Sequence, residues 1–294
     1  MDRQAELAIV RRAYAKQIAA AALISDPRIE GAFAAVHREE FLGPGPWRMM
    51  RLPSAYVTTP DADPLLLYVD QVVGLIPERG INNGQPSLHA RLLAAVKIEE
   101  GEHVVHVGAG TGYYTAIMAL LAGPSGRVTA IEYDSGLAAR ARECLSGNPT
   151  VNVVEGDGAA TSLDDADVIY VNAGVTRPAD NWLDALSDGG RLLLPLTTDK
   201  NFPSLNSGAF DPFRAMNSGA YFLVRRRGAG FEARGLLPTV IIPAEGARDK
   251  ASEELLSAAF AKGGWHSVTR LVRGEAAPEQ RCWLRGDGWC LASD

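Results

Sequence analysis

The spacing of hydrophobic residues changes sharply near the middle of the chain. Val104 to Val107 form a mostly β-branched run that predicts a strand buried in a parallel sheet. The small residues from Gly108 to Gly112 follow and predict a tight loop. From Tyr113 to Leu121 the apolar positions recur at helical spacing. A strand, glycine-rich loop and helix in this order can hold a ligand against bare backbone at a helix N-terminus.

Strand and helix patterns keep alternating on the C-terminal side of this unit. Helical spacing is found over residues 135–145 and 182–186, and strand patterns are found over residues 127–132, 151–155, 167–172, 190–194, 221–227 and 231–242. Regular alternation of this kind predicts an α/β fold with a mostly parallel sheet and helices on both faces. The last two strands are expected near an edge of the sheet.

Helices and an irregular stretch precede the predicted sheet. Helices are expected over residues 3–24 and 28–41, with Asp26 as the N-cap of the second and Pro27 in its first turn. Residues 47–86 have little periodicity apart from a strand pattern at 69–76. Long irregular stretches inside a compact domain are usually functional, and this one leads into a helix predicted over 87–96.

The C-terminal part of the chain has a pattern of its own. It predicts a loop over residues 201–218, a helix over 251–261 and an antiparallel hairpin made of 268–272 and 282–284. Three parts are therefore expected: N-terminal helices with a substrate-side segment (1–90), a central cofactor-binding domain (91–245) and a C-terminal extension (246–294).

Composition excludes several classes of function. The chain has 294 residues, 47% of them hydrophobic, and a formal net charge of -6, so it is a poor match for a protein that binds a phosphate backbone. No apolar run is long enough to span a membrane, and the N-terminus has no signal-peptide pattern. A cytoplasmic protein is expected, with no nucleic-acid or membrane partner; the sequence does not indicate its oligomeric state.

The three cysteines do not have the spacing of a metal site or of a disulfide framework. Cys282 and Cys290 can approach each other across a C-terminal hairpin. In a reducing cytosol, however, free thiols are the expected state. No metal is predicted.

Acidic residues at two strand ends indicate what the glycine loop holds. Glu132 ends the strand after the loop, where an acid can accept hydrogen bonds from ribose hydroxyls, and Asp157 follows the next strand between two glycines. The loop reads Gly-x-Gly-x-Gly, and Tyr113 stands where a dinucleotide fingerprint has its third glycine. An adenosyl ligand without a pyrophosphate, S-adenosylmethionine, is therefore favoured over a nicotinamide dinucleotide. The predicted cofactor residues are Gly108, Ala109, Gly110, Thr111, Gly112, Glu132, Tyr133, Asp157, Gly158 and Asn172.

Each of these signals has a plainer interpretation when taken alone. Glu132 can be a solvated strand end, and Gly156 to Gly158 can be an ordinary turn. Their common position at the carboxyl ends of parallel strands favours a cofactor site.

Several segments, in order and spacing, resemble the protein-L-isoaspartate O-methyltransferase family. They are DPRIEGAFAAVHREEF, GQPSLHA, VVHVGAGTGYYTAIMA, RVTAIEYD, NVVEGDG, DVIYVNAG and LSDGGRLLLPL. The resemblance covers roughly residues 26–246; Arg38 and Phe41 match, and His37 replaces a proline. It implies a Rossmann-like class I methyltransferase fold with a seven-stranded sheet. It also implies S-adenosyl-L-methionine as cofactor: the loop glycines hold its methionine end, Glu132 its ribose, and Asp157 with Gly158 its adenine.

The sequence departs from this family where the methyl acceptor is bound. The family has a catalytic serine two residues before the proline of GQPSLHA, and here that position is Gly84. Asn82, Asn83 and Gln85 have amides that can donate to a carboxylate, although small polar residues also build turns. Asn83, Gly84 and Gln85 are the predicted catalytic residues. Ser87 is expected in the first turn of a helix, and His89 in the core.

Methyl transfer to a carboxylate does not require a general base from this segment. A carboxyl group has a pKa of about 4, so it is ionised at neutral pH and needs no general base. The predicted function is therefore S-adenosylmethionine-dependent methylation of a protein or peptide carboxylate. The alternatives are a related methyltransferase with another acceptor, such as an ordinary peptide aspartate or a small carboxylic acid, and a cofactor-binding protein without catalysis.

Overall fold

The computed structural model describes residues 2–51, 55–199, 218–274 and 281–293, which belong to two compact units. Unit 1 comprises Met1–Val104 and Ala109–Glu155, and unit 2 comprises Val105–Gly108 and Gly156–Asp294. Most of the loop predicted at 201–218 lies outside the described residues. The three-part division of the sequence at residues 90 and 245 stays a prediction.

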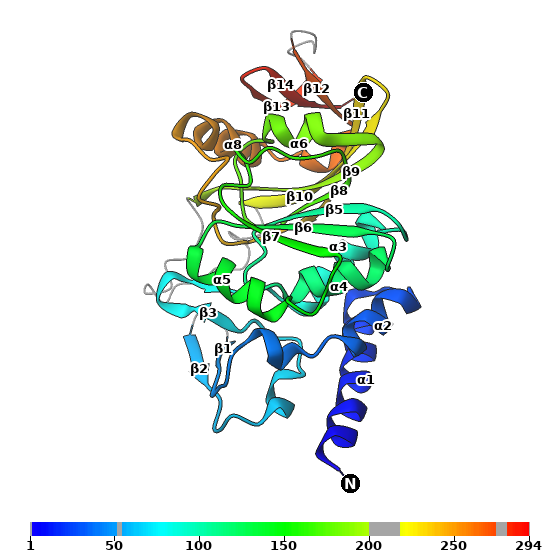
Figure 1. Cartoon of the computed structure of the whole chain (residues 1–294). Helices are drawn as coiled ribbons and strands as arrows, with labels where there is room; N and C mark the ends of the chain where they lie inside the picture. The colour runs from blue at the N-terminus through cyan, green and yellow to red at the C-terminus, as the bar shows by residue number, and fades with distance from the viewer. Residues whose placement is uncertain (1, 52–54, 200–217, 275–280, 294) are drawn as a thin grey trace. The chain divides into compact units, whose positions relative to one another are not determined.

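Unit 1 begins with two helices, α1 (Arg3–Ala22) and α2 (Pro27–Ala35), which pack on each other (Figure 1). Asp26 caps α2 as predicted, because its carboxylate accepts the backbone N–H of Arg28 at 2.8 Å. The prediction of one helix over 28–41 was wrong. Val36 is extended, with φ −80° and ψ 122°, and a separate 3₁₀ turn, η1 (Arg38–Phe41), follows.

Short elements fill the irregular stretch of unit 1. They are β1 (Arg48–Arg51), β2 (Ala55–Thr58), η2 (Pro64–Leu67), β3 (Gly74–Ile76), η3 (Pro77–Arg79) and β4 (Ile81–Asn82). β1 pairs with β2, and β3 with β4, both antiparallel. Only the last part of the strand predicted at 69–76 is regular, because the carbonyls before it turn toward the side chain of Arg38.

The predicted central unit forms as expected. β5 (His103–Val107) leads through the glycine loop into α4 (Tyr113–Ala122), and α3 (Pro86–Val96) precedes it. In unit 1 the chain continues with β6 (Arg127–Glu132), α5 (Ser135–Cys144) and β7 (Val151–Glu155). β6 and β7 pair in parallel, with Glu132 opposite Glu155, so the strand–helix–strand pattern produced the predicted crossover.

Unit 2 contains the end of β5 and the remaining strands. They are β8 (Ala166–Val171), β9 (Leu186–Thr197), β10 (Gly219–Arg227) and β11 (Gly230–Pro238), with α6 (Asp180–Ala185) between β8 and β9. β8 and β9 are parallel, whereas β10 runs antiparallel to both β9 and β11. β11 ends four residues earlier than the predicted strand end at Ile242.

The C-terminal segment adds strands that the sequence pattern assigned wrongly. After α8 (Lys250–Lys262) and η5 (Trp265–Ser267) come β12 (Arg270–Arg273), β13 (Cys282–Gly286) and β14 (Trp289–Ala292). β12 pairs with β11 and with β14, and the hairpin is β13–β14 rather than 268–272 with 282–284 (Figure 1). The described residues therefore contain the strands β5 to β14, three more than the predicted seven.

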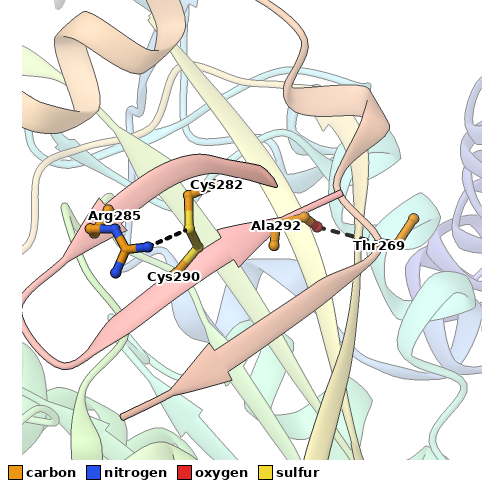
Figure 2. Close-up of a disulfide and its surroundings, with 5 residues drawn as sticks. All are labelled: Thr269, Cys282, Arg285, Cys290 and Ala292. Carbon is orange, nitrogen blue, oxygen red and sulfur yellow. Dashed lines mark hydrogen bonds between the residues drawn. A yellow bond between two sulfur atoms is a disulfide. The ribbon is translucent and has the colours of Figure 1, made fainter. Parts of the chain in front are cut away.

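The β13–β14 hairpin also corrects the prediction of free thiols. Cys282 and Cys290 form a disulfide, with their Cα atoms 6.0 Å apart (Figure 2). A register shift in β13 between Cys282 and Leu284 accompanies this approach. The sequence already indicated that the two cysteines could approach each other. Free thiols were expected only because a reducing cytosol disfavours disulfides.

Replacement of Cys282 by serine is expected to lower the free energy of unfolding by about 2–3 kcal/mol. The bond spans eight residues, and it removes conformational entropy from the unfolded chain. Urea unfolding measured with and without dithiothreitol checks this, because the difference between wild type and variant should vanish in the reductant. Equal stability of the two proteins without reductant would contradict the role of the bond.

Candidate functional site

The glycine loop of unit 1 is fixed to the end of β6. The N–H of Ala109 donates to the carbonyl of Ile131 at 3.2 Å, and the N–H of Gly110 donates to Glu132 Oε2 at 2.7 Å. Gly110 and Gly112 have positive φ angles, 59° and 93°, which side chains rarely tolerate. The loop therefore presents backbone at the start of α4, as the sequence predicted, and Thr111 within it is buried.

Glu132 lies beside this loop with both carboxylate oxygens in use. It is 7% exposed, and its Oε1 accepts the N–H of Asp134 at 2.9 Å. Burial raises the pKa of Glu132, and the N–H groups of Asp134 and Gly110 partly oppose this rise. Each oxygen of a carboxylate can accept a second hydrogen bond, so Glu132 can also receive ribose hydroxyls. Its neighbour Tyr133 is 55% exposed.

Unit 2 holds the other predicted cofactor residues. The backbone N–H of Asn172, at the end of β8, donates to the carbonyl of Val107 at 2.8 Å, and its side-chain Nδ2 lies 3.4 Å from the carbonyl of Gly108. A Cβ at Gly108 would lie 3.2 Å from the carbonyl oxygen of Asn172. Gly108 and Asn172 are therefore neighbours at the end of parallel strands, where α/β sheets bind ligands.

Asp157 and Gly158 of unit 2 form a turn with defined partners. Asp157 Oδ1 accepts the N–H of Ala159 at 2.8 Å. The carbonyl of Gly158 accepts the Trp182 indole N–H at 2.8 Å and Asn181 Nδ2 at 3.1 Å. The ordinary-turn interpretation thus describes this geometry, and an adenine contact for the pair stays a prediction.

The predicted acceptor segment belongs to unit 1. Asn82 Oδ1 accepts the N–H of Gly84 at 2.9 Å, and Asn83 Oδ1 accepts the N–H of Val73 at 2.9 Å. Gln85 is exposed and donates to Asp70 at 3.1 Å. Asn83 is 6% exposed, and its Nδ2 has no hydrogen-bond partner among the described residues. A buried donor of this kind favours a ligand that accepts a hydrogen bond.

Asp70 fixes the position of this segment at the start of α3. Its carboxylate accepts the backbone N–H of Ser87 at 2.8 Å and the Ser87 hydroxyl at 2.6 Å. Ser87 is thus a first-turn residue, as expected from the sequence, and its hydroxyl is already committed. The loop that carries Asp70 is held by the buried side chain of Arg38.

Three contacts within unit 1 join residues 75–84 to the glycine loop, to the first turn of α4 and to the start of α5. The Tyr114 hydroxyl, in the first turn of α4, donates to the carbonyl of Gly84 at 3.3 Å. Arg79 forms an ion pair with Asp134 at 2.5 Å, and a Cβ at Gly110 would lie 3.3 Å from the side chain of Leu75. Sequence reasoning missed Tyr114 and Arg79, because contacts between distant segments leave no periodic signal.

Two histidines lie in the strand before the loop. His106 is fully buried and contacts Tyr170 edge-on at 5.6 Å, and burial lowers the pKa of its imidazole to about 3. His103 is also buried, with its Nε2 3.0 Å from the Thr129 hydroxyl. Both side chains therefore pack inside the protein.

The described ranges contain neither a candidate metal cluster nor a candidate membrane span. There, no cluster of three or more His, Cys, Asp or Glu side chains could hold a metal ion. In the same ranges, no helix is both long and apolar enough to cross a bilayer.

The family model described as Protein-L-isoaspartate(D-aspartate) O-methyltransferase (PCMT) matches residues 11–206, about two thirds of the sequence. This chain belongs to that family. Protein-L-isoaspartate O-methyltransferase of Thermotoga maritima is 32% identical over 177 residues, which are 59% of this chain and 51% of that protein. The protein of the same name from Koribacter versatilis is 34% identical over 178 residues, which are 59% of this chain and 70% of that protein. The chain thus spans about half the length of the Thermotoga relative.

Solved structures of the PCMT family share the fold. One protein-L-isoaspartate O-methyltransferase has a TM-score of 0.63 and 25% identity, and the match covers 90% of this chain and 74% of that one. A putative family member from Plasmodium falciparum, in complex with S-adenosyl-L-homocysteine, has a TM-score of 0.59 and 15% identity, over 80% and 98% of the two chains. The predicted Rossmann-like class I methyltransferase fold is therefore confirmed.

Proposed function

We propose that this PCMT-family chain is an S-adenosylmethionine-dependent O-methyltransferase that esterifies a carboxylate of a protein or peptide. Family membership and the names of the relatives support this activity. The solved relative from Plasmodium falciparum contains the demethylated form of the cofactor. The observation in this chain that carries the proposal is the Tyr114 contact, which holds the acceptor segment at the loop predicted to bind the methyl donor.

The residues at the glycine loop fit S-adenosylmethionine, which supplies the methyl group when it is bound. Backbone at Gly110 and Gly112 can approach the methionine end, because neither residue carries a side chain there. Glu132 keeps acceptor capacity for the ribose hydroxyls beside its two backbone bonds. Titration with S-adenosylhomocysteine and with NAD in a calorimeter tests this assignment: only the first should bind. Binding of NAD alone would support a nicotinamide enzyme instead.

The acceptor carboxylate needs orientation rather than a base. It is already ionised at neutral pH, so catalysis depends on holding one oxygen in line with the methyl group and keeping water away. Asn83 offers a buried N–H donor for this purpose. Gly84 offers no side chain, so the hydroxyl that the family resemblance implies is missing.

Within this reaction, an isoaspartyl carboxylate is the acceptor that the family name indicates. An ordinary peptide aspartate or a small carboxylic acid is the second candidate, and Gly84 is the observation that favours it. The residues 1–90 then supply the acceptor side, and the residues 91–245 the cofactor side.

Replacement of Asn83 by aspartate is expected to lower kcat/KM for a carboxylate acceptor by about 10- to 100-fold. Aspartate keeps the oxygen that accepts the Val73 N–H, but it loses the Nδ2 donor and adds a charge that repels the substrate. The assay measures methyl ester formation together with S-adenosylhomocysteine affinity, which should not change. Unchanged kcat/KM in the variant would exclude Asn83 as the donor.

A further inference from the structure

A histidine ring fills the space beside the glycine of the acceptor segment. Gly84 has a φ of +74°, and a Cβ built there would lie 2.9 Å from His89 Cδ2 and still closer to Nε2. Ordinary contacts begin at about 3.4 Å, so a side chain at position 84 and this imidazole exclude each other.

The ring cannot easily move away from Gly84. His89 is 1% exposed, and it stacks on Tyr114 with ring centroids 3.7 Å apart and an interplanar angle of 19°. The same tyrosine donates from its hydroxyl to the carbonyl of Gly84 at 3.3 Å. The backbone N–H of His89 also donates to the carbonyl of Gln85 at 3.1 Å. Gly84, His89 and Tyr114 therefore pack against one another, next to the first turns of α3 and α4.

We propose that Gly84 and His89 are a specificity-determining pair. The imidazole occupies the space that a side chain at residue 84 would enter, so no hydroxyl from this position reaches the acceptor, and Asn83 is left to orient it. The pair thereby reduces the preference for isoaspartyl over aspartyl carboxylates. This inference rests on the proposed function, because it concerns the acceptor of the same reaction.

The test is a cycle of four proteins: wild type, Gly84→Ser, His89→Ala and the double variant. In the wild-type background the serine is expected to lower Tm strongly, because it meets the ring. In the His89→Ala background it should cost only the strain of a positive φ. The double variant is expected to have at least tenfold higher kcat/KM for an isoaspartyl peptide than wild type, and a higher isoaspartyl-to-aspartyl ratio.

Gly189→Ser is the matched control. Gly189 also has a positive φ, +79°, but a Cβ there meets nothing within 4 Å. The decrease in Tm of Gly189→Ser measures the backbone strain alone. The Tm of Gly84→Ser should be lower than that of Gly189→Ser by about 4 °C or more. Affinity for S-adenosylhomocysteine should be the same in all five proteins, which separates the acceptor from the cofactor site.

Two results would overturn the pairing. One is equal loss of Tm in Gly84→Ser and Gly189→Ser; the other is an isoaspartyl-to-aspartyl ratio that is the same in every variant of an active enzyme. A different failure is distinguishable from these: if all proteins bind S-adenosylhomocysteine but none, wild type included, esterifies either peptide, the proposed function itself is wrong.

Discussion

Replacement of Glu132 by glutamine is expected to weaken the binding of S-adenosylhomocysteine by about 100-fold, or about 2.7 kcal/mol. The buried carboxylate would accept the ribose hydroxyls, and hydrogen bonds to a charged acceptor are worth about 1.5–3 kcal/mol each. Glutamine also turns an NH₂ group toward one of the two N–H donors that now fix the loop, those of Gly110 and Asp134. Isothermal titration calorimetry measures the change.

Glu155 is the matched control for Glu132. It ends β7 directly opposite Glu132 in the parallel register, but its side chain is 47% exposed and forms a 3.6 Å ion pair with Arg142. Exposed pairs contribute little, so Glu155→Gln should change the affinity by less than about twofold. Equal affinities of wild type and Glu132→Gln would show that Glu132 only supports the loop.

Replacement of Arg38 by methionine is expected to lower the free energy of unfolding by about 3–5 kcal/mol. The guanidinium is completely buried and donates to the carbonyls of Leu67, Val69 and Gln71 at 2.5, 2.9 and 2.7 Å. Methionine has similar length but no donor, so three carbonyls would lose their partner.

The replacement of Arg38 by methionine should also disturb the acceptor site. Asp70, which lies between two of these carbonyl groups, holds Ser87 and Gln85, so methyl transfer is expected to fall beyond the loss of folded protein. Urea unfolding and a rate measured per folded molecule separate the two effects. Arg12, exposed on α1, provides the control: Arg12→Met should cost less than about 0.5 kcal/mol. A cost of that size for Arg38→Met would contradict the role of its hydrogen bonds.

Most of the α/β fold could be predicted from local sequence patterns. The β-branched run at Val104, the glycine loop and the N-cap at Asp26 each depend on neighbours in sequence, and all three formed as predicted. The order of the last strands did not follow from such patterns, because pairing of β12 with β14 depends on contacts across the described sheet. The break after Ala35 was hidden for a similar reason: helix η1 is placed by Arg38, whose partners lie about 30 residues away.

The candidate site also has contacts that could be predicted from the sequence and contacts that could not. Gly110 and Glu132 could be paired from sequence, because both lie at the ends of predicted parallel strands, and the structure joins them at 2.7 Å. The exclusion between Gly84 and His89 could not be predicted. It depends on the positive φ of Gly84 and on the ring stacking of Tyr114, and neither is visible in residue types.

Transfer of a labelled methyl group tests the central claim most directly. The enzyme is incubated with S-adenosylmethionine labelled in its methyl group and with matched peptides that contain isoaspartyl or aspartyl residues, and the product is treated with base. A carboxyl methyltransferase forms esters, so base should release the label as methanol from at least one peptide, with none released when the acceptor carboxyl is replaced by an amide. Bound cofactor with no base-labile label on either peptide would contradict the account.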